Sequence, residues 1–178
     1  MSLSRRLFLH AAGMAGMALT SSAQGQTVTS ASLGTDPAAD PTAPWAAAPA
    51  ASGHPDPRIR ALAWAVLAPN PHNRQPWIAE LPRAAPDTVV LRCDLTRLLP
   101  VTDPFDRQIT IGLGCFAELF RLAAAAQGLR ATITAFPEGE PGARLDSRPI
   151  ALMHLAPGGV PDPLFAHAAA RRSTKTPF

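Results

Sequence analysis

Apolar residues recur with helical or strand spacing from about residue 57 to residue 170. Asp56 followed by Pro57 is typical of a helix start, because aspartate accepts hydrogen bonds from free backbone N–H groups and proline fits the first turn. Ala68-Pro69 is typical of a helix end. The first predicted helix therefore covers residues 57–67, and its apolar face consists of Ile59, Leu62, Ala63, Val66 and Leu67.

A second, longer helix is predicted over residues 107–127, with Gly128 as a typical C-terminal stop. Gly112 and Gly114 are poor helix formers, so we expect them to permit close packing against another helix. The apolar stripe of this helix is broad and consists of Ile109, Gly112, Leu113, Phe116, Leu119, Phe120 and Ala123.

Two aspartates, Asp103 and Asp106, lie in the loop immediately before the long helix. An aspartate in this position commonly accepts hydrogen bonds from the first N–H groups of the helix. We therefore expect both residues to cap the helix, and not to act as an acid–base pair.

Alternating apolar and polar residues predict four strands, over residues 77–81, 88–93, 131–136 and 150–155. A short helix is expected over residues 161–170. The resulting order is helix, two strands, long helix, two strands and helix, which indicates an α+β domain.

Residues 1–23 have the features of an export signal. Arg5 and Arg6 are followed by one residue, a Phe-Leu pair and a short apolar stretch, and small residues suited to cleavage end at Ala23. This pattern resembles the twin-arginine signal; a general secretory signal or an amphipathic helix is the alternative. We expect the twin-arginine export machinery to carry the folded protein to the periplasm or beyond.

Residues 24–56 are rich in Ala, Pro, Ser, Thr and Gly. Such a composition buries too little apolar surface to offset the entropy of ordering, so it predicts a linker before a domain that starts at residue 57. Among Trp, Phe and Tyr residues, Trp45 is the one that this segment contains. Docking of Trp45 onto the domain and exposure in the linker both stay open.

Composition excludes several classes of protein. The 178 residues suit one domain. No uninterrupted apolar run reaches the roughly 18–20 residues that a membrane-spanning helix needs. The net charge of +3 is small and spread along the chain, which argues against a nucleic-acid partner.

The cysteines and histidines give weak signals. Cys93 and Cys115 can form neither a disulfide framework nor a zinc site; burial as small apolar groups is favoured, and pairing with each other stays open. We also expect no metal site, because the histidines of the chain after the export signal lack metal-ligand spacing. These histidines are His54, His72, His154 and His167.

Two clusters carry candidate chemistry. Asn73 and Gln75 offer side-chain amides that suit the pyrimidine edge of a flavin, although they could instead satisfy backbone groups of their loop. Arg171, Ser173 and Lys175 offer the cations and hydroxyl that a phosphate dianion needs, although they could instead form a solvated basic tail.

Together the two clusters resemble the flavin-dependent nitroreductase family. In that family an Arg-x-Ser-x-Lys/Arg motif grips the FMN phosphate and an Asn-x-Gln-Pro-Trp loop lines the flavin ring. The resemblance therefore assigns Arg171, Ser173 and Lys175 to the phosphate of FMN, and Asn73 and Gln75 to its ring. It names no catalytic residue.

The order of the two motifs is the reverse of that in ordinary family members. It is similar to a subgroup of long, twin-arginine-tagged members related to the mycobacterial dormancy protein Acg, built from two fused half-repeats. Residues 57–178 then correspond to the first half-repeat and the start of the second, with helices packed on a mostly antiparallel sheet. On this resemblance the chain is truncated, and a complete flavin site needs the missing half or self-association of two copies.

Three functions follow from the resemblance. The first is an FMN-dependent oxidoreductase that passes electrons from NAD(P)H to a nitroaromatic or quinone-like acceptor, with the chemistry supplied by the flavin. The second is a flavin-binding or flavin-sequestering protein without turnover, and the third is an inactive half-protein fragment. The lack of NAD(P)H in the periplasm counts against ordinary turnover there.

The intact mass of the natural protein, isolated from its own cells, tests both ends of the chain. We expect a mass about double the 18.7 kDa of this chain, with residues 1–23 absent. A mass that corresponds to residues 24–178 would contradict the expected truncation.

Overall fold

The computed structural model describes residues 2–3 and 42–173. Arg5 and Arg6 of the predicted export signal lie outside the described residues, as does Lys175 of the predicted phosphate motif.

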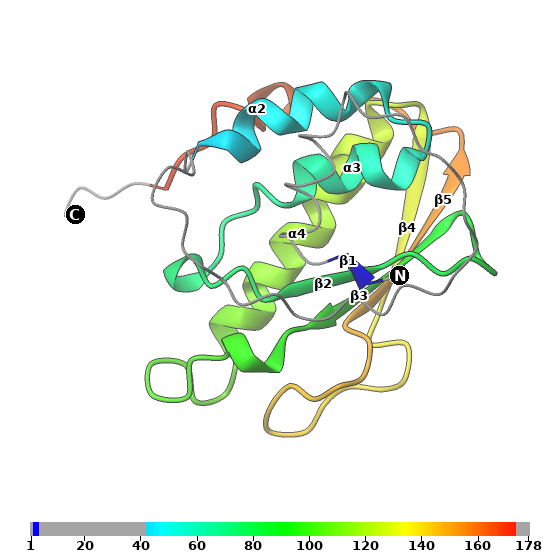
Figure 1. Cartoon of the computed structure of the whole chain (residues 1–178). Helices are drawn as coiled ribbons and strands as arrows, with labels where there is room; N and C mark the ends of the chain where they lie inside the picture. Colours follow the sequence, from blue (N-terminus) through cyan, green and yellow to red (C-terminus); the bar gives the residue numbers. More distant parts are fainter. Residues whose placement is uncertain (1, 4–41, 174–178) are drawn as a thin grey trace, which may run out of the picture.

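The described strands form one antiparallel sheet in the order β1-β2-β3-β5-β4 (Figure 1). Its four main strands lie close to their predicted positions, and β1 adds two residues at the β2 edge. The bounds are Ser2–Leu3 for β1, Trp77–Glu80 for β2, Thr88–Cys93 for β3, Leu129–Ala135 for β4 and Ala151–Pro157 for β5.

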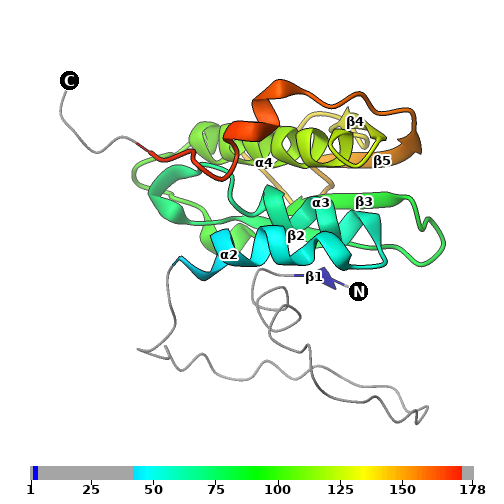
Figure 2. The ribbon, with the colours of Figure 1, turned by 90° about the horizontal axis from the view of Figure 1, so that it is seen from above.

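In the described part of the chain three α-helices cover the sheet, which confirms the predicted α+β class. They lie side by side in the order α2, α3, α4 (Figure 2). Their bounds are Ala43–Ala50 for α2, Pro57–Ala65 for α3 and Arg107–Ala125 for α4. The helix expected over residues 161–170 is a short 3-10 helix, Pro163–His167.

Helix α4 forms the centre of the core. It packs against α3, β4 and β5, and its largest fully buried side chains are Ile109, Leu113, Phe116 and Phe120. By length and composition α4 could cross a membrane, but 61% of its apolar stretch is buried inside the fold. That burial is typical of the core helix of a globular domain.

Helix α3 begins as predicted, with Asp56 as its N-cap: the carboxylate accepts a hydrogen bond from the Arg58 N–H at 2.9 Å. Leu62 is fully buried in the face that was predicted to be apolar, whereas Ile59 and Val66 are half-buried.

The folded part starts earlier than near Asp56. Residues 43–53 of the expected linker form α2 and a 3-10 turn, and α2 packs against α3. Pro44 lies in the first turn, where proline fits, and Ala48 is fully buried because its small side chain permits close packing. Trp45 is half-buried against the core, so docking is the correct alternative for this residue.

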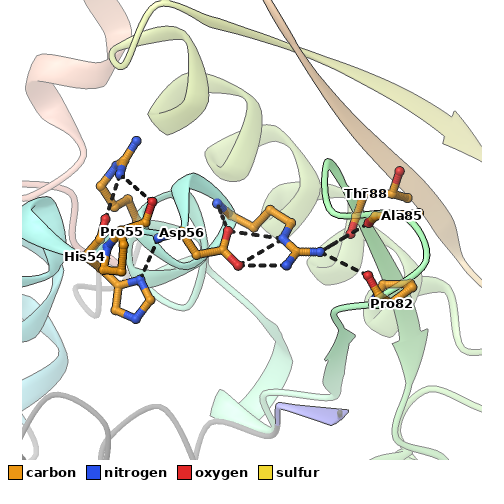
Figure 3. Close-up of polar contacts among 8 residues, drawn as sticks. His54, Pro55, Asp56, Pro82, Ala85 and Thr88 are labelled. Carbon is orange, nitrogen blue, oxygen red and sulfur yellow. Dashed lines mark hydrogen bonds and ion pairs between the residues drawn. The ribbon is translucent and has the colours of Figure 1, made fainter.

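Arg58 joins the start of α3 to the turn between β2 and β3, a role that the sequence did not indicate. Its Nη2 pairs with Asp56 Oδ2 at 2.7 Å, and the Arg58 side chain is only 11% exposed. Its Nη1 donates to three backbone carbonyls of the turn (Figure 3), those of Pro82, Ala85 and Thr88, at 3.4, 3.2 and 3.2 Å.

The Asp56–Arg58 pair makes stability depend on pH. Burial raises the pKa of Asp56, but hydrogen bonds from the Arg58 side chain and backbone outweigh it, so this pKa lies below its ordinary value. A carboxyl whose folded-state pKa is lowered stabilises the fold above its unfolded pKa. This contribution is lost as the pH falls through the folded pKa.

Replacing Arg58 by Met should lower the free energy of unfolding by about 2 kcal/mol, because it leaves Asp56 and three carbonyls without a charged donor. Urea denaturation at neutral pH measures this change. Arg83→Met is the matched control, since Arg83 is exposed in the same turn and should change stability by less than about 0.5 kcal/mol. Equal losses in both variants would contradict the assigned role.

Candidate functional site

A cavity of about 570 Å³ opens between the start of α2, the loop that follows α3 and the last described residues. Its volume is within the range of about 300–1,000 Å³ typical of small-molecule sites. The lining residues are Pro44, Trp45, Val66, Leu67, Ala68, Pro69, Asn70, His72, Asn73, Gln75, Arg171, Arg172 and Ser173.

The cavity brings together the two clusters that the sequence singled out. Asn73 and Gln75 line it from the loop after α3, and Arg171 and Ser173 line it from the far end of the chain. Lys175 lies outside the described residues.

The loop that carries Asn73 and Gln75 has an unusual backbone. His72, Asn73 and Gln75 all have positive φ angles, of 48°, 51° and 53°. Residues other than glycine adopt this conformation at a cost, and such strain tends to occur at binding and catalytic sites.

Side-chain hydrogen bonds hold this loop in shape. Asn70 Oδ1 accepts from the Gln75 N–H at 2.7 Å, and Asn70 Nδ2 donates to the Ala68 carbonyl at 3.2 Å. Asn70 thus forms hydrogen bonds to backbone groups of the loop, which was the alternative role considered for Asn73 and Gln75. The sequence did not single out Asn70. Gln75 Nε2 donates to Asn73 Oδ1 at 2.8 Å, which fixes the two amides relative to each other.

The far side of the loop is anchored by an exchange between two arginines. Arg74 Nε donates to the Arg97 carbonyl at 2.9 Å, and Arg97 Nη1 donates to the Arg74 carbonyl at 2.9 Å. Trp77 follows the loop at the start of β2 and is buried against Phe116, with ring centroids 5.0 Å apart. Neither Arg74 nor Trp77 lines the cavity, so they support the loop from behind.

Gly112 lets α4 approach the same loop closely. A Cβ atom on Gly112 would lie 3.1 Å from Asn70 Cβ and 3.2 Å from Pro71 Cδ. The close partner of Gly112 is therefore the loop, not another helix as the sequence predicted. Gly114 was expected to act likewise, but a Cβ there would meet nothing within 4 Å.

Arg171 is tied to the domain, but one of its buried donors has no partner among the described residues. Its Nη2 donates to the Leu67 carbonyl at 2.7 Å, and its backbone N–H donates to the His167 carbonyl at 2.9 Å. Its Nε is buried and has no hydrogen-bond partner among the described residues. A buried unpaired donor in a cavity-lining residue is typical of a site that is completed by water, an ion or a ligand.

The two aspartates before α4 play different parts. Asp103 caps the helix as predicted, since its Oδ2 accepts from the Ile109 N–H at 2.9 Å. Asp106 occupies the N-cap position of α4, but its side chain makes no cap bond; it is fully buried and accepts from Arg144 Nη2 at 2.9 Å and the Leu145 N–H at 3.0 Å. The Asp106 side chain therefore fixes the loop before β5, and the prediction that this side chain caps α4 was wrong.

Both cysteines are free in the described structure, and Cys93 is buried as expected. Burial, aided by the carboxylates of Asp106 and Asp94, raises the pKa of the Cys93 thiol to about 12. Cys93 is therefore a protonated core residue at neutral pH. Among residues 2–3 and 42–173, no group of three or more His, Cys, Asp or Glu side chains is arranged to hold a metal ion.

Comparison with known proteins gives one partial similarity. No protein-family model matches the chain. Over 79 residues it is 40% identical to a Mycobacterium tuberculosis protein provisionally named NAD(P)H nitroreductase acg, in strains CDC 1551 and H37Rv. The match covers 43% of this chain and 22% of the relative. This similarity supports the nitroreductase family as the group to which the two motifs point.

Gly112→Ala and Gly114→Ala form a matched pair on α4. Gly114→Ala should raise the free energy of unfolding by up to about 1 kcal/mol, because alanine favours a helix and has room there. Gly112→Ala should gain less or lose stability, and should shift the amide NMR signals of residues 70–75, because its Cβ presses on Asn70 and Pro71. Equal gains without such shifts would show that α4 does not seat the loop.

Proposed function

We propose that this chain forms part of the flavin site of an FMN-dependent oxidoreductase of the nitroreductase type. In this proposal NAD(P)H is the electron donor, and a nitroaromatic or quinone-like compound is the acceptor. The observation that carries the proposal is that one cavity is lined by both motifs, Asn73 with Gln75 and Arg171 with Ser173. The similarity to a protein named as an NAD(P)H nitroreductase supports the same assignment.

The donors at Arg171 and Ser173 suit the phosphate of FMN. Arg171 Nε is buried without a partner, which is unfavourable by about 1–3 kcal/mol unless an acceptor is provided. A phosphate presents several acceptor oxygens, and charge-assisted bonds from a guanidinium to phosphate are among the stronger hydrogen bonds in proteins. The exposed Ser173 hydroxyl can donate to the same group. We assign Lys175 to the phosphate on the motif alone.

The linked amides of Asn73 and Gln75 suit the polar edge of the flavin ring. Their mutual bond and the strained backbone hold both side chains in one orientation before a ligand binds. An oriented amide pair presents donors and acceptors together, as the pyrimidine edge requires. Preorganisation of this kind reduces the entropy lost on binding.

FMN held at this site would supply the hydride and electron transfer that side chains do not supply. The residues of this chain would bind and orient the cofactor, with Arg171 and Ser173 at the phosphate and the amides of Asn73 and Gln75 at the ring. Because the match covers only 22% of the relative, we further propose that a further protein segment, or a second copy of this chain, completes the site.

Comparison of FMN with riboflavin, which lacks the phosphate, tests the two assignments separately. Arg171→Ala should weaken FMN binding at least tenfold, because a charge-assisted hydrogen bond is worth about 1.5–3 kcal/mol, and should leave riboflavin binding unchanged. Asn73→Ala should weaken both ligands by a similar factor. Quenching of flavin fluorescence by the full chain measures each dissociation constant.

Arg130→Ala is the matched control, since Arg130 is exposed on β4 and does not line the cavity. Absence of saturable flavin binding by the unmodified chain would contradict the proposal for this chain. Bound flavin that NADPH fails to bleach under anaerobic conditions would favour the flavin-sequestering alternative over an oxidoreductase.

We also propose that the protein is exported through the twin-arginine route to the periplasm. The support is the pattern around Arg5 and Arg6 together with the small residues that end at Ala23. The intact-mass measurement on the natural protein tests this as well, since retention of residues 1–23 would contradict cleavage.

A further inference from the structure

Helix α2 lies outside both sequence motifs and yet borders the site. Pro44 and Trp45 of α2 line the same cavity as Arg171 and Ser173. The wall of the cavity around Arg171 and Ser173 is therefore built from two segments that lie far apart in the sequence.

One contact connects these two segments directly. The guanidinium carbon of Arg172 lies 5.1 Å from the centroid of the Trp45 ring, a cation–π geometry. Arg172 Nη1 also donates to the carbonyls of Ala169 and Arg171, both at 2.8 Å. The Arg172 guanidinium thus links the Trp45 ring to the backbone of Ala169 and Arg171. Arg171 is the residue whose side chain would bind the phosphate.

Trp45 is itself held in place, so it can act as a fixed support. Pro44 is buried, Ala48 is fully buried, and Trp45 packs half-buried against the core. The Trp45 Nε1–H is buried without a hydrogen-bond partner in the described structure, and the ring face of Trp45 contacts the Arg172 guanidinium.

We infer that Trp45 is a positioning residue of the site: its ring clasps Arg172 and thereby orients Arg171 and Ser173 toward the cavity. The consequence for ligand affinity rests on the proposed function, in which these two residues bind the phosphate of FMN. The clasp itself does not depend on that function, because it is a contact within the chain.

Amide hydrogen exchange measures the clasp without any ligand. The N–H groups of Ala170 and Arg171 both donate to the His167 carbonyl, and their exchange reports how firmly this segment is held. Trp45→Ala should speed their exchange about fivefold, as expected for loss of one partly exposed cation–π contact. Trp45→Phe keeps an aromatic ring and should remain within about twofold of the unmodified chain.

Two further variants keep the result interpretable. Ala46→Ser alters an exposed position of α2 and should leave the exchange of Ala170 and Arg171 unchanged. Arg172→Met removes the cation from the other side of the contact and should match Trp45→Ala. If the two residues act through each other, the double variant should add nothing to either single change.

Ligand binding then shows whether the clasp serves the site. Trp45→Ala should weaken FMN binding about fivefold and leave riboflavin binding unchanged, with Trp45→Phe close to the unmodified chain. Faster exchange without flavin binding in any variant would support the clasp and contradict the proposed function. Unchanged exchange in Trp45→Ala, or an equal loss in Trp45→Phe, would overturn the positioning role of the ring.

Discussion

Burial of the apolar face of α4 is the interaction on which the rest of the structure depends. Each of its large buried side chains contributes about 1.5–3 kcal/mol of hydrophobic stabilisation, and the helix contacts α3, β4 and β5 at once. The buried carboxylate of Asp103 caps the start of α4, and the buried carboxylate of Asp106 holds the loop before β5. Once α4 is in place, the lack of a side chain at Gly112 lets the cavity loop pack directly against the helix.

The cavity lies between two parts of the chain that differ in how many hydrogen bonds hold them. The loop around Asn73 and Gln75 is strained at three positions, and bonds from Asn70 and between Arg74 and Arg97 offset that strain. The opposite wall, around Arg171, has fewer such bonds and one donor without a partner. In the proposed function, the first wall would orient the flavin ring and the second would supply the donors for its phosphate.

Periodicity in the sequence was sufficient to predict the main strands, α3 and α4, because each has a clear apolar face or alternation. It missed α2 because alanine and proline pack by close approach of the backbone, which leaves no apolar stripe. It could not assign Arg58, whose carbonyl partners lie in a turn far along the chain, or name the loop as the neighbour of Gly112. The site motifs were predictable as short patterns, whereas Asn70 and Trp45 belong to the site only through the tertiary fold.

The position of α2 also links the expected export step to the site. Cleavage after Ala23 would remove the signal and leave Ala43–Ala50 attached to the domain, because the helix begins well after that point. Export of a folded protein would then keep Trp45 and Arg172 in contact throughout. A segment whose composition is that of a tether can therefore serve two purposes. In the proposed export route its first part would lie in sequence between the signal and the domain, and its last part, α2, lines one wall of the cavity.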